Sequence, residues 1–75
     1  MSKRRPRITA RTLIAALGKL GLVIVRSKGS HRRLRHADGR VTTVPLHAGE
    51  TIGPGLLSKI LRDCEITAEE LSELL

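Results

Sequence analysis

The stretch that decides the fold is LVIVRSKGSHRRLRHADGRVTTVP, residues 22–45. It opens with a continuous run of β-branched residues, which is typical of a buried strand. A short turn around Gly29 follows, and Asp38-Gly39 is a strong hairpin signal further along. Three strands are therefore predicted, at residues 22–26, 31–37 and 40–44. Such short connections make an antiparallel meander.

Side chains alternate between the two faces of a strand, so the second strand has a covered and an open side. Leu34 should point into the core. The opposite, open face then carries His31, Arg33 and Arg35. By the same alternation Arg32 and His36 fall on the covered side and must lie near its rim.

Amphipathic helical segments flank the meander. Before it, Thr9 is a suitable N-cap for an apolar stripe that ends at Gly21. After it, a helix starting at Gly53-Pro54-Gly55 presents an apolar face that includes Cys64. A short acidic helix follows Thr67, which forms a capping-box pattern with the acid three residues later.

The expected fold is therefore α+β, with both main helices on one face of a three-stranded antiparallel sheet and a short extra C-terminal helix. We expect a single domain over residues 8–75, preceded by a disordered basic tail at residues 1–7. The core must be built from Leu, Ile and Val because the chain of 75 residues has no Phe, Tyr or Trp. This composition also lacks the aromatic platform on which single-strand binders stack bases.

Charge is unevenly distributed along the chain, whose net charge is +7. Residues 1–40 contain twelve Lys and Arg and one acid, whereas residues 41–75 contain two Lys and Arg and six acids. One strongly basic region favours a polyanionic partner on one surface. The single cysteine, Cys64, excludes an internal disulfide and suits a reducing compartment. No apolar run approaches the length of a membrane span and no signal peptide is visible, so we expect a cytoplasmic protein without membrane contact.

The run Lys28-Gly29-Ser30-His31 is the main functional signal. A histidine among cations is suited to proton transfer beside a phosphate, and RNA supplies its own nucleophile, the 2′-hydroxyl. His31 is the candidate base, Lys28, Arg33 and Arg35 the candidate phosphate contacts, and the backbone at Gly29 and Ser30 an approach for RNA. A solvated histidine on a basic strand explains the local pattern equally well.

Alternative functions remain at this point. A non-catalytic RNA-binding module would use the same basic face, and a DNA-binding domain would need a basic recognition helix that neither main helix provides. A metal site is disfavoured because the available ligands, His31, His36, His47 and Cys64, show no metal-binding spacing. We expect neither a metal nor a small-molecule cofactor.

Four motifs in order resemble those of HicA-type toxins. Gly29-Ser30-His31 looks like the histidine motif of that family, and the sequence from His36 to Arg40 is similar to its H-P-D-G-R hairpin. Residues 44–47 resemble its V-P-x-H segment, and residues 60–63 its I-L-R/K run. The sequence departs from the family at Leu22 and Leu34, where aromatic residues are frequent, and at Cys64-Glu65, where the family has A-G.

The resemblance covers roughly residues 9–72. It implies a double-stranded-RNA-binding-like α-β-β-β-α fold and an mRNA interferase, that is, an endoribonuclease that acts on mRNA. It also implies a HicB-type antitoxin as partner, with His31 as the catalytic histidine and Lys28 and Arg33 as part of the phosphate-binding surface.

Overall fold

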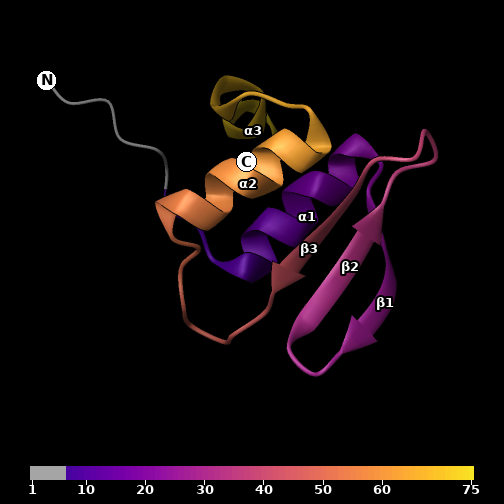
Figure 1. Cartoon of the computed structure of the whole chain (residues 1–75). Helices are drawn as coiled ribbons and strands as arrows, with labels where there is room; N and C mark the ends of the chain where they lie inside the picture. The colour runs from indigo at the N-terminus through magenta and orange to yellow at the C-terminus, as the bar shows by residue number, and fades with distance from the viewer. Residues whose placement is uncertain (1–6) are drawn as a thin grey trace, which may run out of the picture.

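The structure is a computed structural model that describes residues 7–75. Its element order is helix, three strands, helix, short helix, as the sequence predicts (Figure 1). The elements are α1 (Ala10–Leu20), β1 (Val23–Lys28), β2 (His31–Arg35), β3 (Val41–Pro45), α2 (Pro54–Cys64) and α3 (Ala68–Leu74). Of the predicted disordered tail at residues 1–7, residues 1–6 lie outside the described residues.

Local signals set the helix ends. The Thr9 hydroxyl accepts a hydrogen bond from the Thr12 amide at 3.2 Å and so begins α1, and Gly21 ends it in the left-handed conformation with φ +107°. Pro54 occupies the first turn of α2, where its missing N–H costs nothing. The predicted capping box of Thr67 and Glu70 is present at the start of α3.

The strands form an antiparallel sheet in the order β1-β2-β3. On the face covered by α1 and α2, Leu34 of β2 lies opposite Thr42 of β3, and both are buried together with Val44. These strand residues join the apolar faces of the helices in one core (Figure 1). The predicted core position of Leu34 and the α+β architecture are thus confirmed. The described residues contain no helix that is long and apolar enough to cross a membrane.

The first strand differs from its prediction. Leu22 is buried, but the following residues Val23, Ile24 and Val25 are all exposed, so the expectation of a buried strand is wrong. The reason is the position of β1 at the edge of the sheet. The helices pack against β3 at the other side of the meander, and their layer does not extend over β1 (Figure 1).

Candidate active site

The β1–β2 hairpin sets the position of His31. Lys28, the last residue of β1, pairs directly with His31, the first residue of β2. The two-residue loop between them consists of Gly29 and Ser30, and Gly29 has φ +57°. A positive φ at the first loop position is the requirement of a type II′ turn, which glycine meets without strain. The glycine of the motif therefore makes the turn that pairs Lys28 with His31 on one face of the sheet.

The hairpin side chains surround an open, shallow hollow of about 320 Å³ on the uncovered face of the sheet. Its lining consists of Arg26, Lys28, His31, Arg33 and Thr43. The strand register explains this set, because Lys28 lies across from His31, and Arg33 lies between Arg26 and Thr43. No acidic side chain is among the described residues that line the hollow. The site therefore combines one imidazole with three cations on an open surface.

Arg26 is the site residue that the sequence analysis missed. Alternation places it with Leu22 and Ile24 on the covered face. The register shifts between Ile24 and Arg26, because Val25 is an extra residue that forms a β-bulge. The bulge turns Arg26 to the open face, where it lies opposite Arg33. The available signal was that the even-numbered positions of this strand change from apolar at Leu22 and Ile24 to cationic at Arg26 and Lys28, which indicates that they change face.

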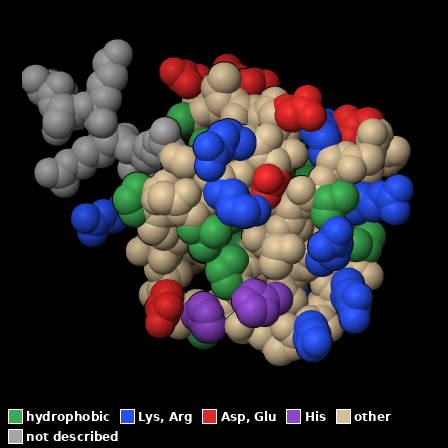
Figure 2. Space-filling model, in the orientation of Figure 1, with side chains coloured by type: hydrophobic (Ala, Val, Ile, Leu, Met, Phe, Trp, Pro, Cys, Tyr) green, Lys and Arg blue, Asp and Glu red, His purple; other side chains and the backbone are tan. Residues whose placement is uncertain are grey.

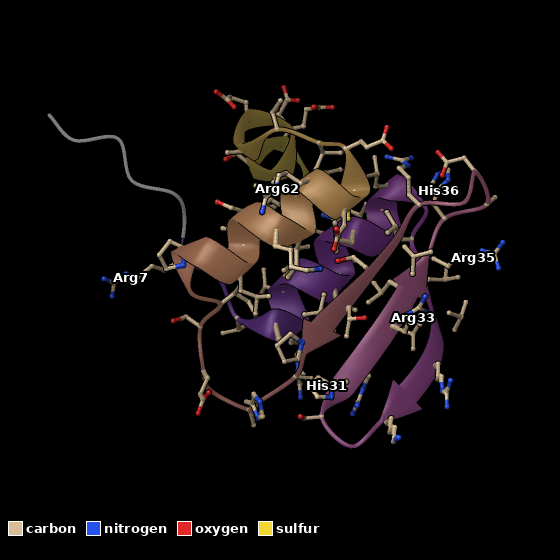
Figure 3. All side chains as sticks on the ribbon, viewed as in Figure 1. Arg7, His31, Arg33, Arg35, His36 and Arg62 are labelled. Carbon is tan, nitrogen blue, oxygen red and sulfur yellow. The ribbon has the colours of Figure 1, made fainter. Side chains whose placement is uncertain are left out.

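The other arginines of β2 lie outside this hollow. Arg35 is exposed and pairs with Val41 one row further along the sheet. In Figure 3 the Arg35 side chain extends away from His31, with Arg33 between them. Arg32 points to the other face, as predicted, and its guanidinium donates a hydrogen bond of 2.6 Å to the Gly29 carbonyl. The structure thus brings Lys28 and Arg33 to His31, while Arg35 extends the same basic face.

His47 lies close to the β1–β2 turn but lines a different hollow. The amide of Leu46 donates to the Ser30 carbonyl at 2.6 Å, which ties the segment after β3 to the β1–β2 turn. The exposed side chain of His47 lines a separate space of about 390 Å³ together with Thr9 and Arg11. His31 is therefore the only histidine among the residues that line the cationic hollow.

The hairpin from His36 to Arg40 has a structural role. The His36 ring lies directly over Gly21, where a Cβ atom would be 2.9 Å from its Nε2. Asp38 accepts hydrogen bonds from the Arg40 amide at 3.0 Å and from its Nε at 2.8 Å, and Arg40 donates to the Cys64 carbonyl at 2.6 Å. The hydrogen bond from the Arg40 amide is the main cause that lowers the pKa of Asp38. Desolvation opposes this effect, and the charge of the Arg40 guanidinium adds to the lowering. This chain of contacts fastens the hairpin to the end of α2.

Charge is separated on the surface as the sequence indicates. Figure 2 shows most acidic side chains gathered at the top, over α3, and Lys and Arg side chains over α2 and along the sheet at the right and bottom, with one acidic side chain at the lower left beside the histidines. Near the sheet, the acid Asp63 is bound by Lys59 at 2.8 Å and by the Thr42 hydroxyl at 3.0 Å. Within residues 7–75, no group of three or more His, Cys, Asp or Glu side chains could hold a metal ion.

Comparison with known families covers most of the chain. The family model for the HicA toxin of bacterial toxin–antitoxin systems matches residues 10–66, which run from the start of α1 to just beyond α2. No curated protein matches the sequence. The matched region includes the hairpin, the cationic hollow and the contacts from His36 to Cys64. The chain belongs to the HicA toxin family of toxin–antitoxin systems.

Proposed function

We propose that this toxin is a cytoplasmic endoribonuclease that cleaves mRNA without a metal ion and that a HicB-type antitoxin neutralises it. The observation that carries the proposal is the hollow in which His31 lies among Arg26, Lys28 and Arg33 with no acid in the lining. A site of three cations attracts a polyanion, and the imidazole within it provides the only proton acceptor suited to neutral pH.

In this reaction His31 acts as the general base. Its imidazole takes the proton of a ribose 2′-hydroxyl while the oxygen attacks the adjacent phosphorus. The bond from the 2′-oxygen to phosphorus forms, the bond from phosphorus to the 5′-oxygen breaks, and the departing oxygen receives a proton from the imidazolium or from water. The products are a 2′,3′-cyclic phosphate and a 5′-hydroxyl. No redox or metal-bound species is involved in these steps.

The neighbouring residues have separate tasks. Lys28 and Arg33 stabilise the negative charge that gathers on the phosphate oxygens, and Arg35 binds a neighbouring phosphate along the sheet. At the turn formed by Gly29 and Ser30, RNA has free access, since a Cβ atom built on Gly29 would have no neighbour within 4 Å. A permanently open cationic site also needs a stoichiometric cover in the cell. The antitoxin serves this purpose by placing acidic groups against the basic face and shielding His31.

The test compares His31→Ala with His47→Ala, a second exposed histidine outside the hollow. Purified proteins are incubated with an unstructured mRNA in the presence of a chelator. His31→Ala should cleave about 10²–10⁴-fold more slowly because it lacks the general base, whereas His47→Ala should remain close to the wild type. Both should keep the thermal stability and RNA affinity of the wild type. The wild-type product should carry a cyclic phosphate.

Three results would contradict the proposal. Undiminished cleavage by His31→Ala would remove the assigned base, and an equally deep loss in His47→Ala would move the chemistry to the other hollow. A wild-type protein that binds RNA tightly but leaves it intact would instead be the non-catalytic RNA-binding module considered above.

A further inference from the structure

The outer edge of β1 is both unpaired and apolar. Val23, Ile24 and Val25 are 58%, 47% and 54% exposed, and they are consecutive residues of one strand. β1 is the first strand in the sheet order, so β2 occupies only one of its sides. Throughout the part of the chain that is described, no backbone group of β1 bonds to a segment other than β2. The hydrogen-bonding groups of its other side therefore face solvent.

An exposed apolar edge strand is unfavourable for an isolated protein, because it can pair with any other extended chain. Native proteins commonly protect such edges with charged residues and bulges. In β1 both devices occur, the bulge at Val25 and the cations Arg26 and Lys28, but they leave the side chains of Val23 and Ile24 uncovered. Consecutive exposed apolar side chains on an unpaired edge strand are suited to a partner that adds a strand to the sheet.

The charges around the edge select the kind of partner. A second copy of this chain would bring its own Arg26 and Lys28, within a net charge of +7, against the same residues. RNA has no peptide groups with which to extend the sheet, and the apolar residues include no aromatic ring for base stacking. A protein segment that is apolar at one end and acidic at the other satisfies both halves of the strand, by pairing with the backbone and by neutralising the cations.

We propose that the antitoxin adds an extended segment to the outer edge of β1, with apolar side chains against Val23 to Val25 and carboxylates beside Arg26 and Lys28. The identity of this partner rests on the proposed function. Both cations also line the hollow of His31. A strand docked at this edge would be separated from His31 by β1, but it would occupy two of the phosphate contacts, so that binding and inhibition arise from the same contact.

The experiment places a lysine in the edge. Val25→Lys introduces a charge that opposes pairing, and Leu75→Lys is the matched control, because Leu75 is 48% exposed but follows α3 and belongs to no strand of the sheet. The probe is the purified protein encoded by the reading frame next to this chain. Calorimetry should show binding to Val25→Lys at least about tenfold weaker than to the wild type, and unchanged binding to Leu75→Lys. An added cation would by itself favour an acidic partner, so electrostatics cannot produce this loss.

Further measurements separate the docking site from the nuclease. Val25→Thr, which keeps a β-branched side chain, should lose less affinity than Val25→Lys, and both should cleave RNA like the wild type. In hydrogen exchange, the probe protein should protect the β1 amides of the wild type. Equal affinity for Val25→Lys, or β1 amides that stay unprotected, would overturn the docking site while leaving the nuclease assignment intact. The docking site would also be overturned if the probe protein did not bind the wild type, or if the wild type self-associated and Val25→Lys abolished that self-association.

Discussion

Replacing Arg26 by glutamine tests whether the β-bulge really delivers a phosphate contact to the site. Arg26, Lys28 and Arg33 line the hollow. Each phosphate neutralised on a single strand contributes about −0.7 to the slope of log K against log salt, so these three contacts and the proposed Arg35 contact together give a slope of about −2.8. Between 50 and 200 mM salt this corresponds to a roughly 50-fold loss of RNA affinity for the wild type, and to a roughly 18-fold loss for Arg26→Gln, which keeps three contacts.

The assay is fluorescence anisotropy with a 2′-O-methyl oligoribonucleotide, which binds but lacks the nucleophile for cleavage. Arg62→Gln is the control, because Arg62 is an exposed cation on α2 and lies well away from His31 in Figure 3. Its slope should equal that of the wild type. If Arg26→Gln retains the wild-type slope, the hollow does not hold a phosphate at this position. If Arg62→Gln becomes as shallow as Arg26→Gln, RNA binds diffusely over the surface and the open sheet face has no special role.

Three further predictions concern stability and reactivity. Arg40→Gln should lower the free energy of unfolding by about 2 kcal/mol in urea titrations, because its charged hydrogen bond to the Cys64 carbonyl is lost, and a loss below about 0.5 kcal/mol would show that the contact is dispensable. Burial opposes ionisation of Asp63, but the hydrogen bonds from Lys59 and Thr42 outweigh burial and lower the pKa of this carboxyl. Ionised Asp63 therefore stabilises the fold above the ordinary pKa of 3.8, and this contribution is lost as pH falls from 3.8 through the lowered pKa of the folded state. Asp63→Asn should make the free energy of unfolding less dependent on pH in this acid range, and an unchanged dependence would contradict this. Burial raises the pKa of Cys64 to about 11, so the native thiol should resist iodoacetamide at pH 8 and react only after unfolding in guanidinium, whereas rapid native labelling would mean that this part of the core opens readily.

Local signals in the sequence were sufficient for the helices and for one face of the sheet. Thr9, Gly21 and the Thr67 capping box act through contacts within a few residues, so their effect can be inferred without knowing the tertiary fold. Leu34 was placed correctly because alternation along a regular strand depends only on position, and the same rule put His31 and Arg33 on the open face.

The remaining features depend on the arrangement of distant elements. A run of β-branched residues indicates a strand, but whether that strand is covered depends on where two short helices lie across the sheet, and here their layer leaves β1 uncovered. The bulge at Val25 then breaks the alternation that the prediction assumed and brings Arg26 into the site. Similarly, nothing in the local sequence revealed that Arg40 reaches the end of α2.

The separation of the two histidine motifs has an evolutionary consequence. His31 lies on an open surface where a substitution leaves the core untouched, whereas His36 lies over Gly21, and Arg40 fastens its hairpin to α2. Under the proposed mechanism, selection on toxicity acts on His31, whereas selection on folding acts on His36 and Arg40. A lineage in which the toxin is no longer useful can therefore lose His31 by a single mutation and still accumulate a folded protein, while the hairpin sequence from His36 to Arg40 continues to be preserved. Silenced copies should be recognisable by an intact hairpin beside a missing His31.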